Sequence, residues 1–163
     1  MLLGRIVPPS GGETEFCDLR HAWDRLSADE KARLRGMTAS HSIIHSRTLT
    51  GCHEWAEGVR ERLPSIDRPL VDEHEETGRT ALLIASHIEK LTGLTGEETV
   101  ALVADLTARA ATPDNAYRHA WQPGDLLLWD NRCVMHRATP FEMGKYPRDV
   151  RSTRLVDTRE MAA

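Results

Sequence analysis

The sequence predicts an α+β, β-rich fold, namely a double-stranded β-helix (jelly roll) with helical insertions. Extended patterns dominate both ends of the chain, at Leu2–Val7 and again from Tyr117 onward. Segments with helical spacing of apolar residues lie between them, at Leu19–Arg35 and after Thr95. The length of 163 residues fits one domain with a hydrophobic core, so residues 1–163 are expected to form a single domain.

Composition excludes several classes of protein. The formal net charge is −4, which gives no basic surface for nucleic acid. No apolar run approaches the length of a membrane span, and the N-terminus is too short for a signal peptide, so we expect a cytoplasmic protein without a membrane partner. The three cysteines, Cys17, Cys52 and Cys133, are an odd number without CxxC spacing, which is typical of free thiols in a reducing cytosol.

The N-terminal elements follow from breakers and caps. Leu2–Val7 alternates and predicts a strand, which the Pro- and Gly-rich run 8–12 ends. Glu13–Cys17 is extended again, so the Gly-Gly-Glu-Thr run at 11–14 by itself indicates a plain hairpin connection. Leu19–Arg35 is predicted to be helical, and a capping box that begins at Ser27 divides it into two helices.

Residues 37–68 form the least regular part of the sequence. His41 and His45 have the spacing of a metal-binding pair on a helix. However, Ser42-Ile43-Ile44 is β-prone and no carboxylate stands at a helpful spacing, so a metal site is disfavoured here. The next predicted elements are a strand from Asp67, a buried strand at Ala81–Ala85 and an amphipathic helix after the capping box Thr95–Glu98.

The stretch Trp121–His136 organises the C-terminal part. Pro123-Gly124-Asp125 predicts a turn, and the apolar run Leu126–Trp129 predicts a buried strand. A polar run at 130–133 and a second short strand that ends on His136 follow. A lone histidine at such a place is more often a core residue than a metal ligand.

Arg148 changes the balance between these two interpretations of His136. Alternation along residues 148–154 would place Arg148, Val150 and Ser152 on one face of a strand. An arginine aimed into a barrel is costly unless it meets an anion. A histidine and an arginine on neighbouring strands therefore suit a metal ion together with a bidentate carboxylate.

These residues carry a resemblance to a known family. Trp129-Asp130-Asn131-Arg132 with His136, followed by Arg148, resembles the C-terminal motif of the Fe(II)/2-oxoglutarate dioxygenases of the taurine dioxygenase and 2,4-dichlorophenoxyacetate dioxygenase family. The similarity runs from about Pro8 to about Asp157. The dichlorophenoxyacetate branch is the more similar one at a further set of positions, Tyr117-Arg118-His119, Trp121, Gly124-Asp125 and Cys133.

The resemblance implies an activity and a set of site residues. The activity is hydroxylation of a small-molecule substrate, with Fe(II) as cofactor and 2-oxoglutarate as cosubstrate that leaves as succinate and CO₂. His136 is implied to be an iron ligand, and Thr14 and Arg148 are implied to hold the distal carboxylate of 2-oxoglutarate. Asp130 and Asn131 are expected to order the strand pair around His136 and not to bind iron.

Two departures from the family pattern stand out. The family takes its other two iron ligands from a His-x-Asp motif, and this chain contains none, so we expect an N-terminally incomplete, C-terminal part of such an enzyme. In taurine dioxygenase the residue four positions after the cosubstrate arginine is a substrate-binding arginine. Here that position is Ser152, beside Arg151, and these two residues are the expected substrate-binding positions.

The missing ligands leave two functions open. The leading hypothesis is a 2-oxoglutarate-dependent dioxygenase or a fragment of one. The rival is a catalytically inactive jelly-roll module that acts in binding or assembly. Sheet edges left unpaired at the N-terminus would also favour self-association, so a homo-oligomer is an open expectation.

Overall fold

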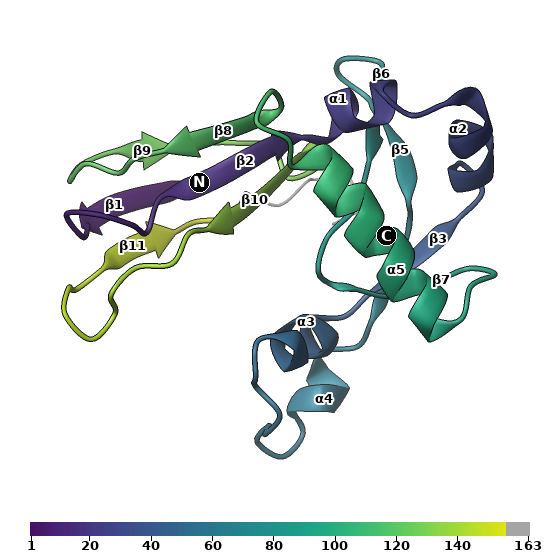
Figure 1. Cartoon of the computed structure of the whole chain (residues 1–163). Coiled ribbons are helices and arrows are strands. Elements are labelled where there is room, and N and C mark those ends of the chain that lie inside the picture. Colours follow the sequence, from purple (N-terminus) through teal and green to yellow (C-terminus); the bar gives the residue numbers. More distant parts are fainter. Residues whose placement is uncertain (156–163) are drawn as a thin grey trace. The chain divides into compact units, whose positions relative to one another are not determined.

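The computed structural model describes residues 1–155 of the chain, and its contacts divide them into two compact units (Figure 1). The first unit comprises Met1–Phe16, Tyr117–Asn131 and the chain from His136 onward. The second comprises Cys17–Ala116 and Arg132–Met135. The structure is mixed α+β with several small antiparallel sheets, which agrees with the predicted class.

The first unit is built from short strands. One sheet has the order β11-β1-β9, formed by β11 (Asp149–Ser152), β1 (Leu2–Ile6) and β9 (Leu126–Leu127). Both pairings are antiparallel, with Leu2 opposite Ser152 on one side and Leu3 opposite Leu126 on the other. A second sheet has the order β10-β2-β8, formed by β10 (Val134–Ala138), β2 (Thr14–Asp18) and β8 (Ala116–His119), whose strands also continue into the second unit.

The apolar run at 126–129 differs from its prediction. Only Leu126–Leu127 forms a strand, and Leu126 and Leu128 are 62% and 69% exposed, so the prediction of a buried strand was wrong. Leu3, which pairs with Leu126, is 39% exposed as well. An apolar run indicates burial only if another layer covers its face, and residues 1–155 leave these leucines exposed.

The second unit holds the helices and the main hydrophobic core. Its elements in chain order are α1 (Leu19–Asp24), α2 (Ala28–Leu34), β3 (Thr38–His41), α3 (Ile43–Leu49), α4 (Val59–Arg62), β4 (Ile66–Pro69), β5 (Val71–His74), β6 (Arg79–Leu82), β7 (Ile88–Leu91) and α5 (Gly96–Ala110). The sheets have the orders β4-β3-β7 and β5-β6. Helix α5 packs against β7 and α1 (Figure 1). Trp23 and Leu106 of the two helices join Leu70, Leu82 and Leu91 in the core.

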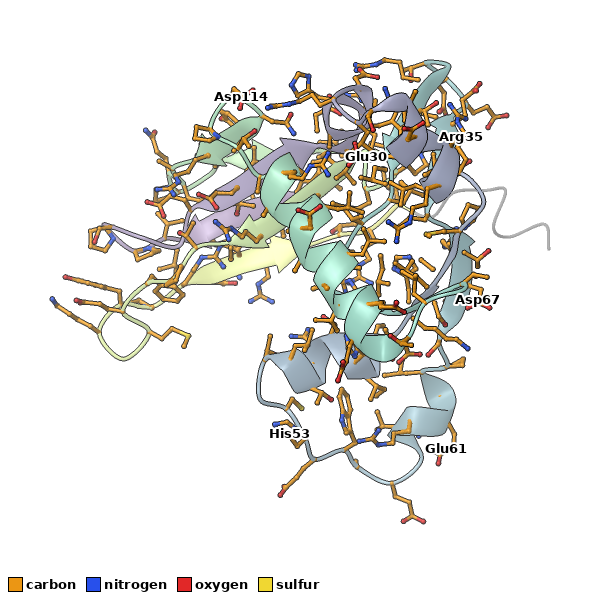
Figure 2. The ribbon with its side chains drawn as sticks, turned by 45° about the vertical axis from the view of Figure 1, so that its right-hand side comes forward. Glu30, Arg35, His53, Glu61, Asp67 and Asp114 are labelled. Atoms are coloured by element: carbon orange, nitrogen blue, oxygen red, sulfur yellow. The ribbon has the colours of Figure 1, made fainter. Side chains whose placement is uncertain are left out.

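Capping explains where these helices begin. The capping boxes predicted at Ser27 and Thr95 are both present and open α2 and α5. The β-prone run at 42–44 is instead the start of α3, because the Ser42 side chain accepts a hydrogen bond from His45 N at 3.1 Å. A side-chain cap of this kind outweighs the weak β-propensity of two isoleucines. His53 lies in the loop between α3 and α4 (Figure 2).

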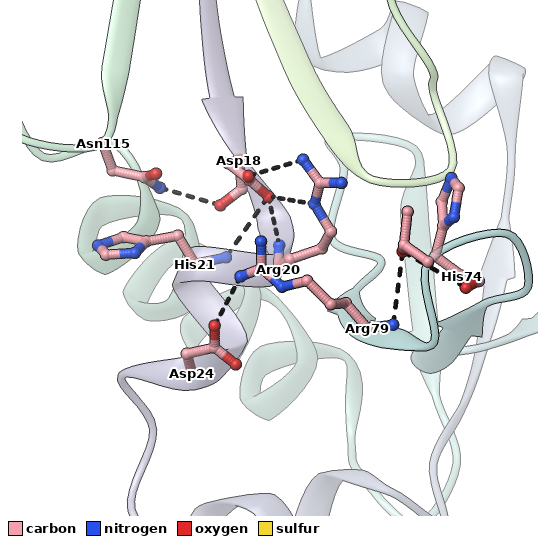
Figure 3. Close-up of polar contacts among 8 residues, drawn as sticks. Asp18, Arg20, His21, Asp24, His74, Arg79 and Asn115 are labelled. Atoms are coloured by element: carbon pink, nitrogen blue, oxygen red, sulfur yellow. Dashed lines mark hydrogen bonds and ion pairs between the residues drawn. The ribbon is translucent and has the colours of Figure 1, made fainter.

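Polar contacts hold the first helices of this unit in place. Asp18 caps α1 by accepting from Arg20 N at 2.8 Å, and its carboxylate also accepts from Arg20 Nε and Nη2 (Figure 3). Arg79 Nη2 donates to Asp24 at 2.7 Å from the neighbouring hairpin. Glu30 of α2 meets Arg109 of α5 at 2.5 Å, and this bond and the Ser27 backbone N–H lower the pKa of Glu30 to about 2 (Figure 2).

Two expectations from composition can be compared with these elements. In the part of the chain that the structure describes, no helix has the length and apolar character needed to cross a membrane. Cys17 and Cys133 are buried and Cys52 is exposed, and within residues 1–155 none of the three forms a disulfide, as predicted.

Candidate functional site

The first unit places Thr14 at the start of β2 and Arg148 against the pair of glycines that precedes this strand. Gly11 and Gly12 have φ of +74° and +70°, the left-handed region that glycine enters without strain. A Cβ on Gly11 would lie 2.6 Å from Pro140 O, and one on Gly12 would lie 3.2 Å from Arg148 Nε. The Gly-Gly run is therefore more than the plain hairpin connection that its composition indicates, because it lets the chain approach Arg148 closely.

Arg148 immediately precedes β11 and reaches back to this glycine pair. Its Nη2 donates to Gly12 O at 3.2 Å, and its guanidinium lies 6.0 Å from the centre of the Phe141 ring. Its Nε is buried without a hydrogen-bond partner, and among residues 1–155 no carboxylate pairs with it. Leaving such a donor unsatisfied costs about 1–3 kcal/mol. The guanidinium is therefore suited to an anion supplied from outside the chain.

The neighbouring arginine faces a different environment. Arg151 Nε pairs with Asp149 at 2.8 Å, its side chain is 67% exposed, and Asp149 also pairs with Arg5 at 3.0 Å. An ion pair between residues two apart is what an extended strand allows, because alternate side chains share a face. Ser152 is exposed, and the substrate-binding roles of Ser152 and Arg151 stay predictions.

Thr14 begins β2 and is 2% exposed. Its hydroxyl accepts a hydrogen bond from Trp121 Nε1 at 2.9 Å. Gly12 stands two residues earlier, so its Cα lies within about 7 Å of the Thr14 Cα. Thr14 is therefore close in the chain to the glycine whose carbonyl oxygen accepts from Arg148. The sequence did not predict the hydrogen bond between Trp121 and Thr14, because a donor and an acceptor 107 positions apart leave no local pattern.

Glu15 of β2 and Glu13, which directly precedes this strand, are both hydrogen-bonded to neighbouring side chains. Glu15 accepts from Arg137 Nε at 2.6 Å and Arg118 Nε at 2.9 Å, and these two bonds lower its pKa. Glu13 accepts from the Thr139 hydroxyl, which lowers the pKa of that carboxyl too. The acids of β2 are thus already engaged by their neighbours, and they do not compete for Arg148.

His136 lies within β10 and is surrounded by aromatic rings. The strand continues to Ala138, so the prediction that it ends on His136 was wrong by two residues. The imidazole centre is 4.7 Å from the Trp129 ring and 6.2 Å from the Phe16 ring, and Trp129 Nε1 donates to Asn131 at 2.7 Å. Sequence reasoning missed Phe16, although it shares a face of β2 with Thr14 by alternation.

Comparisons with known proteins assign the chain to a family. The chain belongs to the family described as "Taurine catabolism dioxygenase TauD, TfdA family", whose profile matches residues 1–154. Relatives therefore include 2-oxoglutarate-dependent (alpha-ketoglutarate-dependent) dioxygenases.

Three relatives show the extent of the match. Over 143 residues the chain is 42% identical to an alpha-ketoglutarate-dependent 2,4-dichlorophenoxyacetate dioxygenase of Burkholderia sp. (strain RASC), covering 88% of this chain and 48% of that protein. It is 42% identical over 145 residues to an (S)-phenoxypropionate/alpha-ketoglutarate-dioxygenase of Sphingobium herbicidovorans, covering 85% and 50%. The crystal structure of AAD-2 in complex with Mn(II) and N-oxalylglycine matches with a TM-score of 0.85 at 35% identity, covering 92% and 59%. The chain spans about half the length of the curated relatives it matches.

Proposed function

We propose that this chain is the cosubstrate-binding part of an Fe(II)- and 2-oxoglutarate-dependent dioxygenase. In the overall reaction, substrate, O₂ and 2-oxoglutarate give hydroxylated substrate, succinate and CO₂. One oxygen atom of O₂ enters the substrate as a hydroxyl group, and the other enters succinate. We also propose that the complete fold around this part is the double-stranded β-helix that the sequence predicts.

The observation that carries the proposal is the state of Arg148. Its Nε is buried and has no hydrogen-bond partner among residues 1–155, although acids elsewhere in the first unit are paired with other arginines. The distal carboxylate of 2-oxoglutarate would give the guanidinium a bidentate partner. The Thr14 hydroxyl would donate a further hydrogen bond to the same carboxylate, because Thr14 stands two residues after the glycine that Arg148 already contacts.

The residues present fit the iron only in part. His136 would supply one ligand, and the aromatic rings of Trp129 and Phe16 beside it restrict how its imidazole can turn. Three protein ligands are usual for iron of this kind, which activates O₂ when bound, and no His-x-Asp motif stands in the 163 residues. We therefore assign this chain the capture and orientation of the cosubstrate, together with one iron ligand.

The substrate side of the proposal rests on Arg151 and Ser152. Arg151 is held by Asp149, so an anionic substrate would have to displace that carboxylate before it could bind there. Ser152 offers a neutral hydroxyl at the position where taurine dioxygenase has an arginine. The proposed substrate is a small organic molecule.

Calorimetric titration of the chain with 2-oxoglutarate tests the proposal. Pyruvate, which has the keto acid but no distal carboxylate, is the matched control ligand. We expect saturable binding of 2-oxoglutarate and at least tenfold weaker binding of pyruvate. Equal affinities, or no binding of 2-oxoglutarate, would contradict the proposal.

The rival function is an inactive jelly-roll module that binds or assembles with a partner. Translation of the DNA upstream of Met1 in all frames separates the two. A His-x-Asp on a β-prone stretch would support the dioxygenase, and its absence would support the rival.

A further inference from the structure

We infer that Trp121 is a positioning residue for the cosubstrate, acting through Thr14. Its indole N–H fixes the Thr14 hydroxyl so that the hydroxyl proton is left for the distal carboxylate of 2-oxoglutarate. The inference rests on the proposed function and adds to it a residue that acts without touching the ligand.

Hydrogen-bond counting gives the first step. An indole N–H can only donate, so in the 2.9 Å bond between Trp121 Nε1 and Thr14 Oγ1 the threonine oxygen must accept. A threonine hydroxyl has one proton, and that proton is then free for a different acceptor. Residues 1–155 give it none, although Thr14 is only 2% exposed. A buried hydroxyl in this state is a prepared donor.

The indole itself is held by two neighbouring residues. A Cβ on Gly4 would lie 2.8 Å from Trp121 Cε3, so the glycine of β1 lets the ring lie directly against the strand. The His119 ring also contacts the indole in a T-shaped arrangement, with ring centres 4.8 Å apart and planes at 89°. His119 Nε2 is 2.9 Å from Asp125 Oδ2, which also accepts from Gln122 N at 2.8 Å. The ring is therefore locked by the turn that follows it.

The backbone reinforces the same arrangement. Gly4 N donates to Asp125 O at 2.9 Å, and Gly124 N donates to Gly4 O at 2.7 Å. Strand β1 and the turn at 122–125 are thus hydrogen-bonded to each other beside the indole. Rotation of the indole away from Thr14 would break into this packing, so the direction of its N–H is set before any ligand binds.

A purely structural role makes a different prediction. A buried indole usually has an acceptor, and loss of the bond would lower stability in either case. Only a positioning role predicts that the change in 2-oxoglutarate affinity disappears once the Thr14 hydroxyl is absent. The double-mutant cycle between the two residues is therefore the deciding measurement.

The experiment is calorimetric titration of the chain with 2-oxoglutarate. Trp121→Phe keeps a ring against Gly4 and removes the donor, and we expect it to raise Kd about two- to tenfold, as for one neutral hydrogen bond. Thr14→Val should raise Kd similarly, Thr14→Ser should restore most of the affinity, and Trp121→Phe in the Thr14→Val background should add little. Trp23→Phe, at a buried tryptophan of the second unit, is the control and should leave Kd unchanged.

A second variant covers the case in which Trp121→Phe does not fold. Gly4→Ala removes no donor but displaces the indole, and it should raise Kd for 2-oxoglutarate while affecting pyruvate little. Independent, additive effects of the Trp121 and Thr14 substitutions would overturn the positioning role and leave the proposed function intact. Failure of the unsubstituted chain to bind 2-oxoglutarate would overturn the proposed function, and the positioning role with it.

Discussion

Replacement of Arg148 by alanine should abolish most of the affinity for 2-oxoglutarate. The bound carboxylate would pair with a guanidinium whose Nε is buried and finds no hydrogen-bond partner in the described part of the chain. Truncating one partner of such a buried charge pair typically costs about 2–5 kcal/mol in binding, because the other charge is left without compensation. At tenfold per ~1.4 kcal/mol, Kd should rise by a factor on the order of 30 or more.

Conservative and neighbouring variants refine this magnitude. Arg148→Lys keeps the charge but loses the planar fork, so it should recover only part of the affinity. Thr14→Val removes one neutral donor and should cost about 1 kcal/mol. Arg151→Ala is the control for Kd of 2-oxoglutarate measured without substrate, because Arg151 is exposed and already paired with Asp149.

Two assays report on the same site. Calorimetry gives Kd for 2-oxoglutarate in the chain itself, and succinate formation gives the apparent KM in an extended version that carries an upstream His-x-Asp strand. A severe effect of Arg151→Ala together with a silent Arg148→Ala would refute the reasoning. The cosubstrate arginine would then be Arg151, and the strand would present its alternate face to the ligand.

Three further outcomes are expected. Asp18→Asn should lower the free energy of unfolding at pH 7 by about 0.5–1 kcal/mol, as for a partly exposed ion pair. Burial acts to raise the pKa of Asp18, but hydrogen bonds from Arg20 outweigh it and lower the pKa. In chemical denaturation at several pH values, the stability difference between the unsubstituted chain and the Asp18→Asn variant should therefore be complete above pH ~4 and shrink below it. Fe(II) should bind this chain weakly in anaerobic titration with 2-oxoglutarate, because His136 alone cannot replace three ligands, and a charge-transfer band at stoichiometric iron would contradict this. The chain should self-associate in size-exclusion chromatography with light scattering, because Leu3 and Leu126 are exposed apolar residues on neighbouring strands. Leu126→Lys should reduce this association. A monodisperse monomer with a cooperative melt would contradict the prediction of self-association.

Local chemistry in the sequence determined much of the secondary structure. The capping boxes at Ser27 and Thr95 fix where α2 and α5 begin, because a Ser or Thr oxygen satisfies backbone N–H groups whatever surrounds it. At residues 42–44 two local preferences compete, a helix cap at Ser42 and the β-propensity of the isoleucines. The chain is helical there, because the cap contributes more free energy than the β-propensity does. The motif formed by Trp129, His136 and Arg148 identified the family without any structure.

Burial and pairing across the chain depended on the tertiary structure. Leu126 belongs to an apolar run, but its exposure depends on what covers the sheet, which no local pattern states. Within residues 1–155, Arg148 bonds to Gly12 O and leaves its Nε without a partner, and the Thr14 hydroxyl accepts from Trp121, 107 positions away. Hydrogen bonds of this kind form only when distant segments pack, so the sequence indicated which residues are candidates for the site and the packing determined which partners those residues have.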